Sequence, residues 1–218
     1  NFLKQNINNP QKQSLVELCV INESSEYEII HQIPHFIFPI GGLFLTTLPR
    51  FLLVISNHQD KFIKLIEEIN LAYKMSKKNI LSASEIYKLS YLRKCILELL
   101  RLNNPVVTTF RTVGKDLEIE QYKFKKGEQL LILNNPILRD SDYFKNPNKF
   151  IPERWNNEME KNYYAISFNQ GPQNCPGKEL AIFIAQSFIV NFLKINKILD
   201  MGPSILKTKK ININEIEQ

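Results

Sequence analysis

One cysteine near the C-terminal end of the sequence stands in a setting that suits metal chemistry. Cys175 lies between Gly171 and Gly177, immediately before the apolar run 177–195. A thiol at a helix N-terminus is close to unpaired N–H groups and to the positive end of the helix dipole, and both favour the thiolate that ligates metals. The glycines would permit a tight turn and a close approach of a flat ligand. Taken alone, the pattern still favours a buried structural cysteine, since free cysteine is among the most buried residue types.

A second group combines one carboxylate with two guanidinium groups. Glu98 and Arg101 lie three residues apart and therefore share one face of a predicted helix, and Arg154 follows later in the chain. An isolated Glu-x-x-Arg pair is usually a solvated surface pair of little energetic value. This helix is otherwise apolar, however, so a buried network of Glu98, Arg101 and Arg154 that holds the following loop is the competing interpretation.

Three motifs occur in a definite order. They are Glu-x-x-Arg at 98–101, Phe-x-Pro-Glu-Arg-Trp at 150–155 and Phe-x-x-Gly-x-x-x-Cys-x-Gly at 168–177. In this order and at these distances they resemble the C-terminal half of a cytochrome P450, and the resemblance runs roughly from Phe36 to Leu193. It implies a mainly α fold with a small β-sheet, namely the C-terminal portion of the cytochrome P450 fold, and haem b as the cofactor.

The resemblance also implies a role for each matching residue. Cys175 would be the axial thiolate ligand of the haem iron, and Glu98, Arg101 and Arg154 would form a structural triad. The other residues bordering the haem would be Phe168 beside the sulfur, Gly171 and Gly177 in the cysteine loop, and Arg111, which would meet a propionate from the sheet edge. A thiolate ligand pushes electron density to iron and so favours cleavage of an O–O bond.

Two departures from the family pattern concern the haem and its oxygen side. Family members usually have a basic residue two positions before the thiolate cysteine and often a His before Arg-Asp, whereas this chain has Gln173 and Leu138. Oxygen-activating members have an acidic residue followed by Thr in the long helix, but 41–47 reads Gly-Gly-Leu-Phe-Leu-Thr-Thr. The acidic residue is missing, but two threonines are present. The resemblance therefore makes Thr46 and Thr47 the candidate catalytic residues of this helix.

The resemblance implies a haem-thiolate oxidoreductase, and the first hypothesis is a cytochrome P450 monooxygenase that acts on an apolar small molecule. Its electrons would come from a redox partner, a reductase or a ferredoxin. One alternative is an enzyme that rearranges fatty-acid hydroperoxides, because Gly41-Gly42 followed by Pro49 resembles the helix of allene oxide synthases and hydroperoxide lyases. Their active-site Asn before Gly-Gly is absent here. A second alternative is a truncated haem-binding relic without catalysis.

These residues require a mainly helical scaffold, which hydrophobic periodicity predicts. The apolar run 35–56 predicts a long, broken and buried helix rather than a membrane span, because prolines and Arg50 interrupt it. Amphipathic spacing predicts a helix over 57–76, and the Ser-Ala-Ser-Glu box at 82–85 predicts a short helix after it. The other predicted elements are a short helix or strand at 15–21, a helix over 90–102 capped by Ser90, a small β element over 106–133 with strands at 117–119, 122–124 and 128–133, a long loop over 134–162, and a helix over 177–195 that is buried all round.

The composition is that of a folded globular protein. The 218 residues are 44% hydrophobic and 23% charged, which excludes collagen-like, disordered and disulfide-scaffold classes. Cys19, Cys95 and Cys175 are odd in number and widely spaced, which indicates a reducing compartment, on the cytoplasmic side. No signal peptide is visible at the start of the sequence, and no membrane anchor is expected in this chain.

The net charge favours contact with something acidic. The chain has 28 Lys+Arg against 22 Asp+Glu, a formal net charge of +6. Under the cytochrome P450 resemblance, the partner would be an acidic electron donor and not nucleic acid. Its docking face would contain five lysines, Lys123, Lys125, Lys126, Lys161 and Lys178. The alternative interpretation is that these lysines only keep the surface soluble. The three histidines have no metal-like spacing and are expected to be structural, and membrane association is left open.

Overall fold

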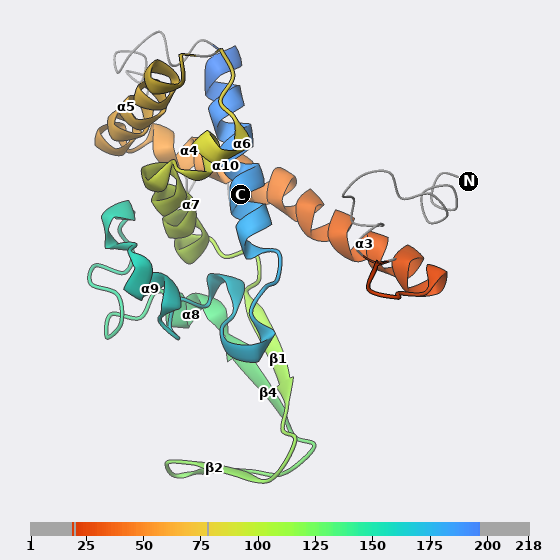
Figure 1. Ribbon diagram of the computed structural model, residues 1–218. Coiled ribbons are helices and arrows are strands. Elements are labelled where there is room, and N and C mark those ends of the chain that lie inside the picture. The colour runs from red at the N-terminus through yellow and green to blue at the C-terminus, as the bar shows by residue number, and fades with distance from the viewer. Residues whose placement is uncertain (1–18, 20, 78, 197–218) are drawn as a thin grey trace. The chain divides into compact units, whose positions relative to one another are not determined.

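The computed structural model describes residues 19, 21–77 and 79–196 (Figure 1). The chain divides into two compact units, residues 1–44 and residues 45–218. Its described elements are mostly helices, with two small antiparallel sheets. This confirms the predicted fold class. The short element expected at 15–21 falls mostly outside the described residues.

Helix α3 (Glu26–Gly42) makes up most of the described part of the first unit. Ser25 caps it, because its hydroxyl oxygen accepts the backbone N–H of Glu28 at 3.2 Å. The Glu28 carboxylate accepts the Ser25 backbone N–H in return, at 2.7 Å. The helix continues through Pro34 and Pro39. The prolines therefore do not break it, contrary to the expectation from the sequence.

The long helix changes its winding where the two units meet in sequence. A π-helical segment, Leu43–Thr47, leads into α4 (Leu48–Ser56). In α4 the side chains of Leu48, Phe51 and Ile55 are buried. Among the described helices, the stretch Glu26–Ser56 is long and apolar enough to cross a bilayer, by length and composition.

Four further helices form the body of the second unit. They are α5 (Gln59–Ser76), α6 (Ala83–Tyr87), α7 (Ser90–Leu102) and α10 (Lys178–Ile195). α7 contacts α4, α5 and α10, and every residue from Cys95 to Arg101 is buried (Figure 1). α7 is therefore the helix around which the second unit is packed.

The start of α7 is capped from another helix. The serine box at 82–85 caps α6 as predicted, but Ser90 is the first residue of α7 and does not cap it. Instead, the carboxylate of Glu68 in α5 accepts the backbone N–H groups of Tyr91 at 2.7 Å and Leu92 at 2.9 Å. The prediction of a Ser90 cap is wrong because the acceptor comes from a residue that is distant in sequence.

Helix α10 buries one face within the described chain. Ile182, Ala185 and Ile189 are at most 1% exposed, whereas Leu180 is 54% and Ile195 is 77% exposed. The expectation of burial all round is therefore not met in this structure. Residues on the buried face recur at three- and four-residue spacing, which is the pattern of a helix packed on one side.

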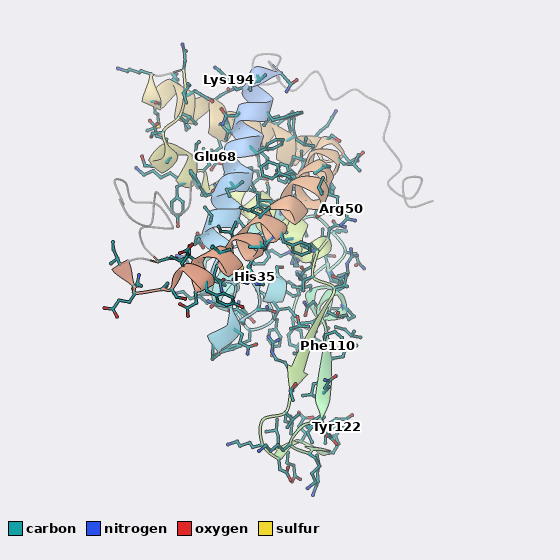
Figure 2. The ribbon with its side chains drawn as sticks, turned by 90° about the vertical axis from the view of Figure 1, so that its right-hand side faces the viewer. His35, Arg50, Glu68, Phe110, Tyr122 and Lys194 are labelled. Atoms are coloured by element: carbon teal, nitrogen blue, oxygen red, sulfur yellow. The ribbon has the colours of Figure 1, made fainter. Side chains whose placement is uncertain are left out.

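The β element consists of two antiparallel ribbons rather than one sheet. The strands are β1 (Thr108–Thr112) paired with β4 (Gln129–Leu133), and β2 (Leu117–Ile119) paired with β3 (Tyr122–Phe124). Gly127, in the turn before β4, has φ +90°, which glycine adopts without strain. β1 was not among the expected strands. Figure 2 shows the side chains of Phe110 in β1 and Tyr122 in β3, which are 66% and 59% exposed.

The predicted loop over 134–162 contains short helices. They are α8 (Asn134–Leu138), the 3-10 turn η2 (Pro152–Arg154) and α9 (Asn157–Lys161). Two more 3-10 turns follow, η3 (Ile166–Phe168) and η4 (Gly171–Gln173). The Asn- and Pro-rich sequence suits single helical turns, since Asn156 caps α9 by accepting the N–H of Met159 at 2.8 Å.

Candidate functional site

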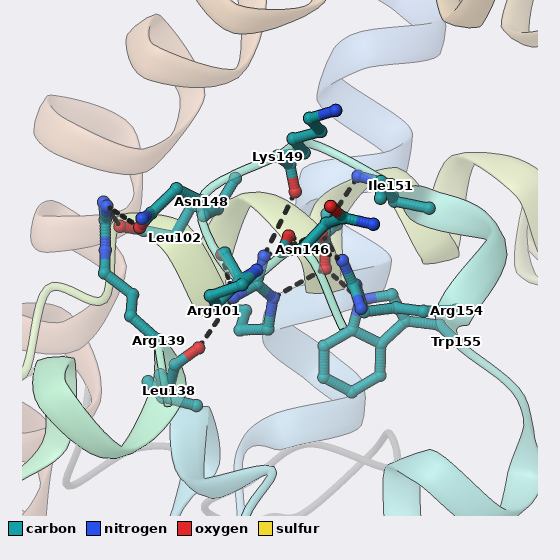
Figure 3. A network of polar contacts seen from close by, with 12 residues as sticks. Arg101, Leu102, Leu138, Arg139, Asn146, Asn148, Lys149, Ile151, Arg154 and Trp155 are labelled. Atoms are coloured by element: carbon teal, nitrogen blue, oxygen red, sulfur yellow. Dashed lines mark hydrogen bonds and ion pairs between the residues drawn. The ribbon is translucent and has the colours of Figure 1, made fainter. Parts of the chain in front are cut away.

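The carboxylate of Glu98 lies at the centre of a buried polar network. Figure 3 shows three donors of this network, Arg101, Arg154 and Trp155. Arg101 donates to the carboxylate from Nε and Nη2, each at 2.9 Å. Arg154 Nε donates at 3.1 Å and Trp155 Nε1 at 2.9 Å, and the backbone N–H of Ile151 adds a bond at 3.0 Å. Glu98 and Arg101 are 0% exposed. The hydrogen bonds replace the hydration that the buried carboxylate has lost.

The two arginines of the network also bind the backbone between α8 and η2. Arg101 donates to the carbonyl oxygens of Leu138, Pro147 and Lys149, at 2.7, 2.7 and 3.3 Å. Arg154 donates to those of Lys145 and Asn146, at 2.9 and 3.3 Å. Glu98 and Arg101 are thus no solvated surface pair. They tie a segment without long helices or strands to the central helix α7.

The cysteine loop, Phe168–Gly177, precedes α10. Cys175 is half-buried, and its backbone N–H donates to the carbonyl oxygen of Phe168 at 2.7 Å, which closes the loop. Gly171 has φ +71°, where a residue with a side chain would be strained. If a Cβ were added at Gly171, no heavy atom of the described residues, apart from those next to Gly171 in the chain, would lie within 4 Å of it. At Gly177, the added Cβ would lie 3.9 Å from Cys175 Sγ. A flat ligand can therefore approach the backbone near the sulfur.

Apolar packing connects the cysteine loop to the polar network. Leu97, Trp155, Ala165 and Ile182 form a buried cluster, and Phe168 packs against it. Leu97 adjoins Glu98 in α7, and Trp155 is itself a donor in the network. The first residue of the cysteine loop therefore rests on the same residues that surround the buried carboxylate.

The two cysteines of the second unit differ in burial, and therefore in how well each is suited to bind a metal. Cys95 is 0% exposed in α7. Burial raises the pKa of its thiol, and the carboxylates of Glu68 and Glu153 raise it further. A thiol in such surroundings stays protonated. Cys175 is half-buried and lies in the loop just before α10, so it is the more accessible of the two to a ligand.

The other candidate residues, Arg111, Thr46 and Thr47, lie in elements other than the cysteine loop. Arg111 lies in β1 and donates from Nη1 to the carbonyl oxygen of Phe110 at 2.8 Å. Thr46 and Thr47 lie in the π-helical segment, and Thr47 is 5% exposed. Among the described contacts, no hydrogen bond or ion pair joins Arg111 or Thr47 to Cys175. The structure thus brings together the triad and the cysteine loop, but not these residues.

Trp155 and Glu153 belong to the site, although the sequence did not assign them a role. Trp155 directly follows Arg154, and a buried indole N–H needs an acceptor, which is the signal that could have identified it. Glu153 accepts from Lys61 Nζ and Lys64 Nζ, each at 3.0 Å, and from Tyr91 Oη at 3.2 Å. These bonds attach η2 to α5 and α7.

The donor set fits a haem on the side of the cysteine. A half-buried thiol and open space at Gly171 would give a flat macrocycle access to the cysteine loop, and at Gly177 the atom nearest to an added Cβ is the Cys175 sulfur itself. Positively charged partners for the haem propionates are fewer than the family pattern has. Gln173 is neutral and exposed, and Leu138 is fully buried with its carbonyl bound to Arg101.

Comparison with known proteins identifies the family of this chain. Residues 44–200 match the family model described as cytochrome P450. Beta-amyrin 11-oxidase of Glycyrrhiza uralensis is 35% identical over 137 residues, which cover 63% of this chain and 28% of that protein. Cytochrome P450 4d2 of Drosophila melanogaster is 27% identical over 202 residues, which cover 88% of this chain and 40% of that protein.

A solved structure shows the same fold. The crystal structure of the cytochrome P450DA heme domain superposes with a TM-score of 0.60 at 20% identity, covering 67% of this chain and 33% of that chain. The chain spans 28% to 40% of the length of the two curated relatives above. Glu98, Arg101, Arg154 and Cys175 all lie within the segment that the family model matches. The chain belongs to the cytochrome P450 family, whose members use haem.

Proposed function

We propose that Cys175 ligates haem b and that the protein is a monooxygenase acting on an apolar small molecule. The observation that carries this proposal is the position of Cys175, which is half-buried just before α10 in a loop packed through Phe168 onto α7. Haem, when bound, supplies an iron centre whose thiolate ligand promotes cleavage of an O–O bond.

The residues of this chain hold the thiolate in place. Cys175 lies in the loop three residues before the first residue of α10. The loop is closed on one side by the bond from Cys175 N–H to Phe168, and on the other the backbone N–H of Lys178 donates to the Cys175 carbonyl at 3.3 Å. The Glu98 network keeps the supporting surface rigid, so its role is in folding rather than in the reaction.

A redox partner with an acidic surface is part of this proposal. Its docking face is smaller than the five lysines suggested, because three of them are paired within the chain. Lys123 lies 3.5 Å from Glu118, Lys125 lies 2.8 Å from Asp116, and Lys178 lies 3.2 Å from Glu160. Lys126 and Lys161 have no ion pair among the described residues. Electron transfer from an acidic donor should therefore depend only weakly on salt.

The spectrum of the haem-loaded protein tests the ligand assignment. The protein is loaded with haem, reduced and exposed to carbon monoxide, and a thiolate ligand gives a strongly red-shifted Soret band. We expect Cys175→Ser to lose this band, whereas Cys95→Ser and Cys19→Ser retain it. A band that survives Cys175→Ser and disappears in either control would refute the assignment. Haem binding without turnover of any oxidant would favour the non-catalytic relic.

A second candidate function is the rearrangement of fatty-acid hydroperoxides. The observation that favours it is the π-helical segment Leu43–Thr47, which contains two threonines but no carboxylate. Dioxygen cleavage needs protons delivered to a buried oxygen atom, usually by positioned acid and base groups. A hydroperoxide already contains its O–O bond and does not require such a relay. The two functions therefore differ in the oxidant they consume.

A further inference from the structure

A cluster of charged residues outside the family motifs joins three helices. Arg93 of α7 donates from Nε and Nη2 to both carboxylate oxygens of Glu160 in α9, at 3.1 and 2.7 Å. It also donates from Nη1 and Nη2 to both carboxylate oxygens of Glu179 in α10, at 2.8 Å each. One guanidinium thus makes two bidentate ion pairs, which is a geometrically specific arrangement.

This cluster contacts the chain on both sides of Cys175. On the C-terminal side, Lys178 Nζ lies 3.2 Å from the carboxylate of Glu160, and Glu179 lies in the first turn of α10. On the N-terminal side, Gln170 Nε2 donates to the carbonyl oxygen of Glu160 at 3.3 Å and to two further carbonyl oxygens at 3.2 and 3.3 Å. The end of α9 therefore holds the cysteine loop before and after the thiol.

The cluster is partly shielded from water, which strengthens its ion pairs. The side chains of Arg93 and Glu160 are 20% and 19% exposed, while that of Glu179 is 50% exposed. Burial raises the pKa of Glu160, but Arg93 and Lys178 together outweigh burial and lower it. The pKa of Glu179 is lowered chiefly by its hydrogen bonds from Arg93. Tyr87 Oη also donates to Glu179, at 3.1 Å. Both glutamates therefore remain ionised and bound at neutral pH.

Arg93 also lies on the face of α7 that supports the cysteine loop. It precedes Leu97 by four residues, so the two side chains are neighbours along the helix, and Leu97 belongs to the cluster on which Phe168 packs. We propose that Arg93 is a positioning residue for the cysteine ligand: by binding Glu160 and Glu179 it fixes the cysteine loop against α7. Cys175 then keeps the orientation that haem ligation requires. The role of Arg93 toward haem rests on the proposed function.

The first test follows the cysteine loop without haem, by hydrogen–deuterium exchange of the full chain. Arg93→Met should accelerate exchange in peptides covering 168–178 by about tenfold or more, because the loop loses its anchor. Arg93→Lys should give a smaller acceleration, since an ammonium cannot form two bidentate pairs. The control is Lys61→Met, which removes a different ion pair between elements, the one with Glu153. Loop exchange in Arg93→Met equal to that of wild type or of Lys61→Met would overturn the proposal.

The second test measures the ligand itself in haem-loaded protein. At equal haem content, Arg93→Met should show a smaller fraction of the thiolate carbon monoxide adduct than wild type, and Lys61→Met should match wild type. An unchanged thiolate fraction in Arg93→Met, with the band present in wild type, would overturn the positioning role alone. Absence of the band in wild type would instead overturn haem ligation by Cys175 and, with it, the role of Arg93 toward haem. Arg93→Lys, which retains the charge, repeats both measurements if Arg93→Met fails to fold.

Discussion

Glu98 is a buried charged residue whose hydrogen-bond partners all come from this chain. Its carboxylate is fully buried and accepts hydrogen bonds from Arg101, Arg154 and Trp155. A buried charge of this kind is tolerated only while its partners remain, because the protein interior cannot replace lost hydration. The half-buried thiol of Cys175 is different, since the proposed function assigns it an external partner, the haem iron.

At the same residue scale, the strength of the network can be measured one donor at a time. Arg101→Ala leaves a buried carboxylate short of its counter-charge and should cost about 3 to 5 kcal/mol. Trp155→Phe removes one hydrogen bond to a charged acceptor, which should cost about 1.5 to 3 kcal/mol, and the smaller ring adds a cavity cost to this loss. Unfolding of the full chain by urea measures both. A Trp155→Phe variant as stable as wild type would show that the indole bond does not contribute.

Glu153 predicts a pH dependence of stability. Burial raises its pKa, but hydrogen bonds from Lys64 and Lys61 outweigh burial and bring it to about 2, below the ordinary 4.5. A carboxyl whose pKa is lower in the folded protein stabilises it above the unfolded-state pKa, and this contribution is lost as the pH falls through the folded-state pKa. The stability difference between wild type and Glu153→Gln should therefore be full above pH 4.5 and disappear towards pH 2. Denaturant unfolding across this range measures it, and a difference that stays constant would contradict the assignment.

At the scale of elements, α7 depends on its neighbours for its first turn. Its opening residue is Ser90, yet the N–H groups of Tyr91 and Leu92 are bound by Glu68 from α5. The same helix binds α9 and α10 through Arg93 and the loop after α8 through Arg101. α7 therefore organises the second unit through side-chain contacts along its whole length.

Removing the Glu68 carboxylate, which caps α7, should lower the stability of the protein. Glu68→Ala leaves two N–H groups at the start of α7 without this acceptor and should destabilise the protein by about 0.5 to 2 kcal/mol. The matched control is Glu67→Ala, because Glu67 is exposed and adjoins Glu68 in the same helix. Thermal unfolding of the two variants tests this. Equal melting temperatures for the two would mean that the cap contributes nothing.

At the scale of the whole molecule, the two proposed functions differ in the oxidant that each would consume. The family relationship favours dioxygen and a reductase, whereas the helix over 41–47 lacks a carboxylate to deliver protons. Thr47 is buried in the π-helical segment, and π segments inside helices are frequent at functional sites. The chemistry of this segment therefore decides between the two proposed functions.

We expect the complete, haem-loaded protein to consume an organic hydroperoxide faster than it turns over with dioxygen and a reductase. The reason is that only the dioxygen reaction needs protons delivered through the helix over 41–47. Both rates are measured on one preparation, with Cys175→Ser as the control for reaction at free haem. Tight coupling of reductant consumption to a hydroxylated product, without hydroperoxide turnover, would reject the hydroperoxide route and support the monooxygenase.

The sequence by itself determined the local features of this protein. The spacing of apolar residues predicted α5 and α10, and the serine box predicted the start of α6. The order of the three motifs identified the family. These features are readable because helix periodicity, capping boxes and glycine turns depend on residues within a few positions of one another.

The tertiary structure alone decided which distant groups meet. The sequence pointed to Ser90 as a cap, but Glu68 performs that task, and nothing local linked Arg93 to Glu160 and Glu179. Pairing of β1 with β4 and the indole bond to Glu98 were likewise not predicted. Each of these contacts joins residues far apart in the chain. Their partners are selected by how the helices pack, and no sequence pattern over a few residues contains that information.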